Sequence, residues 1–492
     1  MQLTPSKMLS TAFVLASLLA SARSATVSST PAQTFLGVGG SGAWWPHDLY
    51  QFPPAARANL SNLLFSPSGL GLSSYRYNVG GGGVGVGNPG RAPETTYVSP
   101  GVYNFSADPQ GVLFMQDAAS FGVPITFFVN SAPSPFTTNG ASCGGWFVNG
   151  TGIEYGKYLA DVIAYWHGQG VPVKYISPMN EPDNSFGDPG SCGQEGMEVD
   201  ANQRAEVING LWAGLQSVGL EKTVGILADE LSSLSRAMNE YPIWLPEVVD
   251  KATLVHHTYD FPSDASYSKL VADVAALAPG KKSWMSEVCC SLGLSNGTGK
   301  GWSGGYDPTI QNALMFSGMV FQSFVFAGEP HYDFWTLVSG GMGCQPLNNA
   351  TCVNTPNPDG WTDGIIYYDA DFANNGNYDL YLSKHYWTYK HFGNFVKPGT
   401  VRHPLVGPDV QEYMMAVASE KTYSLLLMNP NSTDSALDVT FHGHVCPLSA
   451  VRTSATEDFA AIAPGAKSSP SVYTLPLKAE SLTTYVFKRG HC

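Results

Sequence analysis

Short apolar or β-branched runs alternate with stretches of helical periodicity along most of this 492-residue chain. The strand-like runs cover residues 34–40, 72–79, 124–130, 173–179, 223–228, 252–258 and 283–286, and an eighth is expected near 333–336. Between them, apolar residues recur at helical spacing in 155–168, 202–218 and 268–277. Strands that alternate with helices indicate a parallel sheet with crossover connections. Eight such units over roughly 360 residues predict an α/β fold, a (β/α)8 barrel with long loops.

The pattern changes after about residue 397. The runs 413–417, 422–428, 436–441 and 481–487 alternate in polarity and are separated by turn residues, with no helical stretch. This pattern predicts a C-terminal antiparallel β-sandwich. We therefore expect four parts: a signal segment at 1–24, an N-terminal segment at 25–36 that adds an edge strand to the sandwich, the catalytic barrel at 37–396, and the sandwich at 397–492.

Residues 1–24 have the pattern of a secretory signal. Lys7 gives a positive start, residues 8–20 are apolar and uncharged, and Ala20, Ala22 and Ser24 offer a cleavage site. The apolar run is too short to span a bilayer comfortably. We expect a secreted, extracellular protein that works as a monomer and has no membrane partner.

Export changes how the eight cysteines are interpreted, because an oxidising compartment favours disulfides over metal sites or catalytic thiols. Eight cysteines allow 105 pairings, which sequence cannot decide. Proximity favours Cys344 with Cys352 and Cys446 with Cys492. The remaining cysteines are expected near the catalytic face, and they are Cys143, Cys192, Cys289 and Cys290.

Six Asn-X-Ser/Thr sequons agree with export through a eukaryotic pathway. They lie at Asn59, Asn104, Asn149, Asn296, Asn349 and Asn431. The net charge of −14 argues against nucleic acid or an anionic membrane surface as a partner. Only 13% of residues are charged and 12% are aromatic, which suits a neutral, hydroxyl-rich ligand, although many secreted proteins share this composition whatever they bind.

Two glutamates stand where two predicted strands end. Glu181 follows the run 173–179, and Glu287 follows the run 283–286. Barrel enzymes carry their chemistry at the carboxyl ends of the strands. Glycosidic-bond cleavage needs two carboxyls, one to protonate the leaving oxygen and one to attack or to activate water. We predict Glu181 as the general acid/base and Glu287 as the nucleophile of a retaining mechanism, with no metal and no cofactor.

Each glutamate alone is more often an ordinary loop carboxylate; their joint placement at one end of the barrel favours catalysis. A rival pair, Asp229 and Glu230, ends the fifth predicted strand. A secreted carbohydrate-binding protein built on an inactive barrel is an alternative from another class. The survival of both carboxyls at the fourth and seventh strands counts against it.

Five further residues are candidates for substrate binding. Asn180 would donate to the sugar hydroxyl beside the anomeric carbon, and Arg76 would favour the ionised form of Glu287. His257 and Tyr259 would contact the nucleophile and the substrate, and Trp335 would offer a platform for a sugar ring. Taken singly, each has a structural alternative: an ion pair for Arg76, a core histidine for His257, simple packing for Trp335.

Residues 80–90 form the only low-complexity stretch, with seven glycines. They contain a literal G-x-G-x-x-G at 85–90. A dinucleotide fingerprint must open a helix whose amides face the pyrophosphate, but Pro89 has no amide proton and no convincing helix follows. We expect a flexible loop beside an active site and no nucleotide.

The ordered set of motifs resembles glycoside hydrolase family 30, within the clan of retaining (β/α)8 hydrolases. The matching pieces include Arg76, the Asn-Glu-Pro of 180–182, His257-Thr258-Tyr259, Glu287 and the run 334–340, together with 37–42, 130–136 and the join at 384–399. The likeness spans nearly the whole chain after the predicted signal. It implies a last barrel helix that runs directly into a side β-sandwich.

Within that family the opening 42–48 (Gly-Ala-Trp-Trp-Pro-His-Asp) is most similar to fungal endo-β-1,6-galactanases. The resemblance implies hydrolysis of β-1,6-linked galactan, a plant arabinogalactan polysaccharide. Other family activities remain as alternatives: endo-β-1,6-glucanase, exo-β-1,6-galactobiohydrolase or xylanase. Family xylanases that read glucuronic acid use an arginine after the eighth strand, and 336–386 contains none. Ala132 and 137–138 also depart from many relatives, which implies a different sugar-binding floor.

Overall fold

The computed structural model describes residues 23–289, 304–411, 413–469 and 471–492. An eight-stranded parallel sheet forms the centre of the molecule, in the order β2-β13-β12-β11-β10-β8-β6-β3. These strands are β2 (Gly37–Gly40), β3 (Tyr75–Asn78), β6 (Ile125–Phe128), β8 (Val173–Ser177), β10 (Gly225–Leu231), β11 (Ala252–His257), β12 (Ser283–Glu287) and β13 (His331–Phe334). A parallel bridge between Ser41 and Arg76 joins the first strand to the second and closes the barrel.

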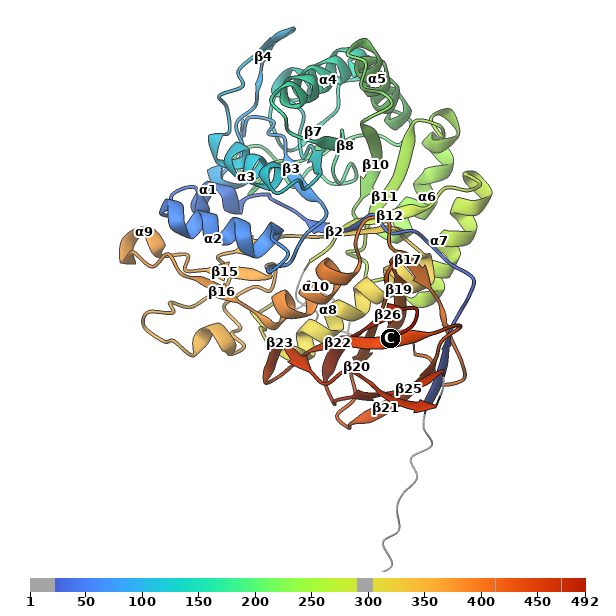
Figure 1. Cartoon of the computed structure of the whole chain (residues 1–492). Helices are drawn as coiled ribbons and strands as arrows, with labels where there is room; N and C mark the ends of the chain where they lie inside the picture. Colours follow the sequence, from blue (N-terminus) through green and yellow to red (C-terminus); the bar gives the residue numbers. More distant parts are fainter. Residues whose placement is uncertain (1–22, 290–303, 412, 470) are drawn as a thin grey trace, which may run out of the picture.

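Helices separate successive strands and surround the barrel (Figure 1). They are α1 (Trp45–Leu49), α2 (Pro54–Phe65), α3 (Pro109–Ser120), α4 (Gly152–Gly168), α5 (Arg204–Ser217), α6 (Leu234–Trp244), α7 (Asp264–Leu277), α8 (Ile310–Gln322) and α10 (Lys384–Phe395). The predicted (β/α)8 barrel is therefore confirmed, and each predicted strand overlaps an observed one. The strands are buried on both faces, as parallel sheets covered by helices require.

The last fifth of the chain supplies most of a β-sandwich, which confirms the predicted second architecture. One sheet has the order β18-β1-β21-β25-β24 and the other β17-β19-β20-β26-β22-β23. The strands are β1 (Arg23–Val27), β17 (Val401–His403), β18 (Leu405–Val406), β19 (Met414–Ala418), β20 (Thr422–Asn429), β21 (Ser435–Thr440), β22 (Val445–Ser454), β23 (Glu457–Ile462), β24 (Ala466–Ser469), β25 (Val472–Leu477) and β26 (Ser481–Arg489). A separate cluster of buried apolar side chains fills the space between the sheets.

The N-terminal strand departs from its predicted position. β1 begins at Arg23, before residue 25, and it lies between β18 and β21 rather than at the edge of its sheet. β1 is not the edge strand because the two-residue strand β18 pairs with the outer side of β1, where Thr26 faces Val406. Asn296, Cys290 and residues 1–22 of the predicted signal lie outside the described residues.

Two helices connect the barrel to the sandwich. α10 contacts β22, β23 and β26, and α8 contacts β26. The segment Ile310–Ala327 is long and apolar enough to cross a membrane by composition, but 78% of it is buried inside the fold. It is therefore a core helix that is covered on nearly all sides.

Three disulfides are found among the described residues. Cys344–Cys352 and Cys446–Cys492 confirm the two favoured pairings. Cys143–Cys192 joins the loop after β6 to the loop after β8. Cys289 is disulfide-bonded as well. The five sequon asparagines within the described ranges are exposed, and they are Asn59, Asn104, Asn149, Asn349 and Asn431.

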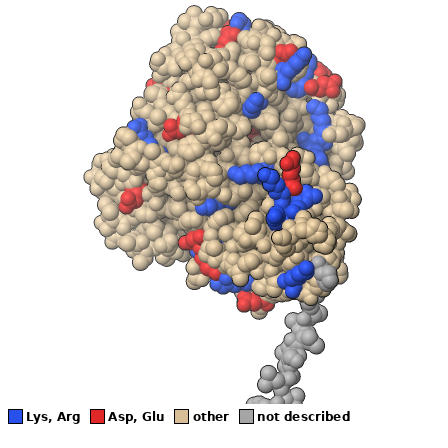
Figure 2. All heavy atoms as spheres, in the orientation of Figure 1, with Lys and Arg blue, Asp and Glu red and all other residues tan. Residues whose placement is uncertain are grey.

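Surface charge is sparse on the face drawn in Figure 2, where a few lysine, arginine and acidic side chains are scattered over an uncharged surface.

Closely packed glycines join α4 to α5. A Cβ on Gly210 would lie 2.0 Å from the carbonyl oxygen of Gly152, and one on Gly156 would lie 2.2 Å from the carbonyl carbon of Gly210. The two helices therefore approach backbone to backbone.

This contact predicts that Gly210→Ala destabilises the barrel. The added methyl meets backbone atoms that cannot rotate away, so we expect the free energy of unfolding to fall by about 2 kcal/mol or more. Urea denaturation followed by circular dichroism measures the change. Gly168→Ala is the matched control, because that glycine is also helical but has open space around it. The control should be neutral or slightly stabilising, and an equal loss in both variants would contradict the packing argument.

Candidate active site

Glu181 and Glu287 reach one pocket at the carboxyl ends of β8 and β12. The pocket has a volume of about 860 Å³. Of the seven predicted site residues, five line it, and they are Asn180, Glu181, Tyr259, Glu287 and Trp335. Arg76 and His257 are fully buried and lie directly behind these side chains. The barrel strands thus bring the candidate residues together from positions more than 200 apart in sequence.

The carboxylate of Glu287 is held at both oxygens. Arg76 donates from Nη1 to Oε2 at 2.7 Å, and the Tyr259 hydroxyl donates to Oε1 at 2.9 Å. The Arg76 guanidinium also stacks over the Phe128 ring, 4.3 Å from its centroid. A guanidinium donor on one oxygen and a hydroxyl donor on the other fix the orientation of a carboxylate more firmly than a single donor. Glu287 therefore has little freedom to rotate.

Glu181 has a different environment. Its Oε1 faces Nδ1 of His257 at 3.1 Å, and its backbone lies in the left-handed region with φ of 42°. Burial raises the pKa of Glu181, although His257 acts in the opposite direction. A raised pKa favours a carboxyl group that can hold a proton near neutral pH, as a general acid must. The two glutamates are therefore differentiated by their surroundings.

His257 links the candidate acid to a third carboxylate. Its Nε2 lies 2.9 Å from Glu230 Oε2, and its Nδ1 lies 3.7 Å from Glu287 Oε1. Burial alone would lower the pKa of His257, but the surrounding carboxylates raise it to about 10. The ring is therefore protonated at neutral pH, and both nitrogens donate. Its complete burial means that it acts on carboxylates rather than on a ligand, which corrects the expected contact with substrate.

Glu230 and Asp229 are fully buried and do not line the pocket. Glu230 accepts from His257, from Arg76 at 3.5 Å and from the Ser286 hydroxyl. Burial opposes ionisation, but Arg76 and His257 lower the pKa of Glu230 to about 2. Asp229 pairs with Arg204 at 2.5 Å. The rival pair is therefore structural, and Glu230 is a counterion for the two buried cations.

One oxygen or nitrogen from each of Glu181, His257 and Glu287 lies within 4.8 Å of the others, a spacing that also suits a metal ion. Both ring nitrogens of His257 already face carboxylate oxygens, Nδ1 that of Glu181 and Nε2 that of Glu230. The donor set therefore fits proton transfer better than metal binding.

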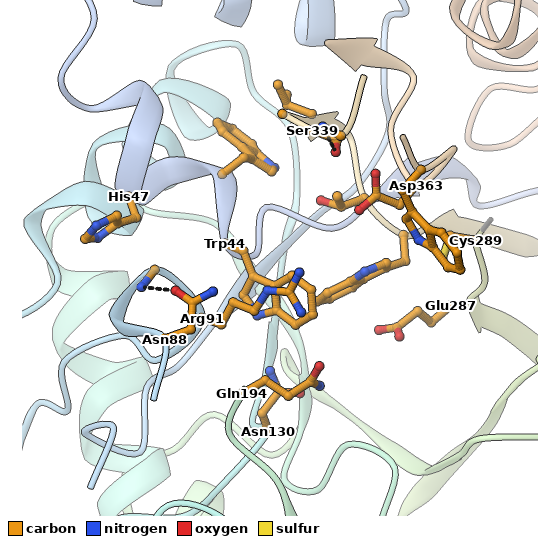
Figure 3. A pocket seen from close by; sticks show the side chains of 18 of the residues that line it. Trp44, His47, Asn88, Arg91, Asn130, Gln194, Glu287, Cys289, Ser339 and Asp363 are labelled. Carbon is orange, nitrogen blue, oxygen red and sulfur yellow. Dashed lines mark hydrogen bonds between the residues drawn. The ribbon is translucent and has the colours of Figure 1, made fainter. Parts of the chain in front are cut away.

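Tryptophans and polar side chains form the outer parts of the pocket (Figure 3). Trp44 packs edge-on against Trp335 with centroids 4.7 Å apart, and the Arg91 guanidinium lies 4.1 Å from the Trp44 centroid. Asp363 projects from the loop after β13, and burial raises its pKa to about 6. Sequence reasoning did not assign Trp44, Arg91, Gln194 or Asp363 to the site. The glycine-rich stretch that Arg91 borders is the one sequence signal that could have placed this residue at the site.

The fold and the paired carboxyls define a glycoside hydrolase. Residues 25–242 match the family model described as O-glycosyl hydrolase family 30. This match covers 218 of the 492 residues, and it supports the resemblance of the chain to glycoside hydrolase family 30.

Individual relatives are distant. An exo-β-1,6-galactobiohydrolase from Bifidobacterium longum subsp. longum is 22% identical over 402 residues, which cover 63% of this chain and 25% of that protein. The chain thus spans about a quarter of the length of this relative. A conserved exported protein from Bacteroides fragilis has a TM-score of 0.77 at 17% identity, with 94% of this chain and 100% of that chain covered. An endo-β-1,6-glucanase has a TM-score of 0.68 at 15% identity, with 94% of each chain covered.

The buried cluster predicts a specific pH dependence of stability for His257→Gln. The pKa of His257 is about 10 in the fold, against about 6.5 in an unfolded chain. Its protonation therefore stabilises the fold fully below pH 6.5, and this contribution is lost as the pH rises through 10. The difference in unfolding free energy between wild type and variant should shrink over this window, by at most about 1.4 kcal/mol per pH unit.

Urea unfolding at several pH values between 6 and 10.5 measures this difference. His403→Gln is the control, because its half-buried ring lies in the sandwich, where it contacts the Ser28 carbonyl oxygen at 2.9 Å and the edge of the Tyr423 ring rather than a carboxylate. A difference for His257→Gln that stays constant across the window would mean that His257 is neutral in the folded chain.

Proposed function

We propose that this protein is a secreted, glycosylated endo-glycosidase that hydrolyses β-1,6-linked galactan with retention of configuration. The substrate class is the β-1,6-galactan side chain of plant arabinogalactan proteins. The proposal rests on the family, on the similarity of residues 42–48 to fungal endo-β-1,6-galactanases, and on the name of the Bifidobacterium relative, which acts on a β-1,6-galactosidic linkage. The signal-like segment and the exposed sequons support export.

The separation of the two carboxyl groups carries the mechanistic part of the proposal. A carboxylate oxygen of Glu181 and one of Glu287 lie within 4.8 Å of each other. Retaining enzymes place their carboxyl groups about 5–5.5 Å apart, whereas inverting enzymes need about 6.5–9.5 Å to admit a water molecule. The distance between these two oxygens falls on the short, retaining side of that division. It supports direct attack by one of the two glutamates.

In the first step Glu287 attacks the anomeric carbon, and the bond from that carbon to the leaving oxygen breaks. Glu181 gives its proton to the leaving oxygen. In the second step the Glu181 carboxylate takes a proton from water, the water oxygen bonds to the anomeric carbon, and the Glu287 ester bond breaks. Arg76 and Tyr259 orient Glu287 throughout, and the His257 imidazolium stabilises Glu181 when it is ionised.

Asn180 is positioned to bind the sugar beside this centre. Its side-chain oxygen accepts from Arg76 at 3.3 Å, and its Nδ2 donates to Asn130 at 3.0 Å. One amide hydrogen is left for the hydroxyl next to the anomeric carbon. Trp335 and Trp44 supply apolar surface on which the faces of sugar rings can stack. Neutral hydroxyl-rich sugars fit a pocket of this composition.

Product analysis on β-1,6-galactan, β-1,6-glucan and xylan tests the substrate. We expect a ladder of galacto-oligosaccharides from the first polymer alone, because endo cleavage gives products of several lengths. A single disaccharide product would instead indicate an exo-galactobiohydrolase. Products from glucan or xylan would transfer the specificity to another activity of the family, and the absence of cleavage in all three would favour the carbohydrate-binding alternative.

Glu181→Gln should separate acid catalysis from the rest of the mechanism. The natural polysaccharide needs a protonated leaving oxygen, so we expect kcat/KM to fall by about 10²–10⁴-fold. An aryl glycoside with an activated leaving group needs little protonation, and its glycosylation step should lose far less. Burst kinetics with the aryl substrate measures that step directly.

Glu287→Gln is the matched comparison, since the same carboxyl-to-amide change removes the nucleophile. Both substrates should then lose activity by more than about 10³-fold. Equal losses on both substrates for Glu181→Gln, or near-normal rates for Glu287→Gln, would contradict the assigned roles. Circular dichroism of each variant checks that the fold is retained.

A further inference from the structure

The glycine-rich loop 80–91 forms one wall of the pocket. It connects β3 to a short 3-10 helix, Pro89–Arg91, and residues Asn88 to Arg91 line the pocket. The Arg91 guanidinium lies over Trp44 (Figure 3). Seven glycines in twelve residues make such a segment flexible in isolation, and ordering it costs conformational entropy. Something in the structure must therefore hold the wall in place.

A buried carboxyl group outside the pocket, that of Glu195, accepts hydrogen bonds from the backbone of this loop; burial raises its pKa to about 8, although the backbone N–H groups of Gly81 and Gly83 act in the opposite direction. Glu195 is fully buried and does not line the pocket, although its neighbour Gln194 does. Its Oε1 accepts backbone N–H groups from Gly81 at 3.1 Å and Gly83 at 2.9 Å, and its Oε2 also lies 3.1 Å from the Gly81 nitrogen. At its other end the Glu195 backbone N–H donates to the Arg91 carbonyl oxygen at 3.4 Å.

The glycines are required for this arrangement. Gly82 and Gly83 have φ of +99° and +68°, which side chains disfavour. A Cβ on Gly81 would lie 2.6 Å from the Ser131 carbonyl oxygen and 3.2 Å from Glu195 Oε1. The loop can wrap a carboxylate this closely because it has no side chains at these positions. The glycine run therefore serves an internal carboxylate and no nucleotide phosphate.

Further contacts hold the middle of the loop to the same segment. The Gly87 N–H donates to the Cys192 carbonyl oxygen at 2.9 Å, and the Gly190 N–H donates to the Gly85 carbonyl oxygen at 2.7 Å. Cys192 is in turn joined to Cys143 by a disulfide. The segment that carries Glu195 is thus itself fixed to the barrel. It offers a rigid support against which the loop can be ordered.

We propose that Glu195 is a positioning residue for the glycosidase reaction: its carboxylate and backbone fix both ends of loop 80–91 and so preorganise the Arg91 wall for sugar binding. Among the described residues, the Arg91 guanidinium donates no hydrogen bond, so its donors are available to substrate hydroxyls. A wall that is ordered before binding lowers the entropy cost of binding. The inference rests on the proposed placement of substrate in this pocket.

Glu195→Gln tests the proposal. Because the Gly81 N–H faces both carboxylate oxygens, either orientation of the amide places an NH2 group opposite a donor. We expect KM on the cleaved polysaccharide to rise by about tenfold, with kcat within about threefold, since neither catalytic glutamate is touched. Hydrogen exchange followed by mass spectrometry should show faster exchange in peptides covering 80–92 and unchanged exchange elsewhere in the barrel.

Glu206→Gln is the matched control. Its carboxylate also accepts a glycine N–H, that of Gly152 at 2.9 Å, but it lies on α5 and does not line the pocket. KM and exchange at 80–92 should not change. If Glu195→Gln fails to fold, Ser142→Ala is the substitute, because the Ser142 hydroxyl donates to the Gly81 carbonyl oxygen and accepts from the Val84 N–H. It should produce the same changes in smaller measure.

An unchanged KM, or unchanged exchange at 80–92, would overturn the proposal, as would a loss confined to kcat. The failure of the proposed function is distinguishable from this result. A wild-type protein that cleaves none of the three polysaccharides would remove the function, whereas a cleaving wild type with a normal Glu195→Gln variant would remove only the positioning role. The hydrogen-exchange measurement needs no substrate, and it decides independently whether Glu195 orders loop 80–91.

Discussion

The catalytic end of the barrel depends on one buried network of ion pairs. Arg76 and His257 place two cations among the carboxyl groups of Glu181, Glu230 and Glu287. Removing one partner from such a cluster leaves an uncompensated buried charge, which typically costs about 3–5 kcal/mol. Glu230 keeps both cations charged without taking part in the chemistry itself. The two reactive carboxyl groups can therefore be buried side by side in different surroundings.

This arrangement explains why the fold closes where it does. Arg76 stands on β3, and the Ser41–Arg76 bridge joins the two strands at which the sheet meets itself. The same residue contacts Glu287 on β12 and Asn180 after β8. A distortion at the closure of the barrel would thus move the guanidinium away from the nucleophile. Arg76 therefore contributes its backbone to the closure of the barrel and its side chain to the site.

Sequence reasoning located the strands and both glutamates because their signals are local. The run Ile125–Phe128 is apolar apart from Thr126, and Glu181 and Glu287 stand at the ends of two other strand-like runs. The helix α8 was not identified because eleven of its thirteen residues are buried, so it has no polar face to reveal a period of 3.6. β22 was missed for a related reason: its burial pattern is irregular, and a bulge between Pro447 and Ser449 breaks the alternation.

The functional pairings beyond the two glutamates required three dimensions. Nothing near Glu195 in the sequence indicates that its carboxylate lies under a glycine loop more than a hundred residues earlier. His257 was correctly placed at the end of its strand, but its position behind the carboxylates depends on a register shift between β11 and β12. Such details arise from the packing of several strands at once.

The sandwich has a consequence for how the chain is made. β1 pairs in parallel with β21, so that Arg23 lies beside Leu437 and Thr26 beside Thr440. During synthesis the first of these strands leaves the ribosome long before its neighbour exists, and the whole barrel is translated in the interval. At about 5–20 residues per second, β1 must wait on the order of half a minute or more for its partner. The sandwich is therefore the last part of the molecule that can be completed. Until then, the unfinished chain carries an unpaired strand that chaperones can bind.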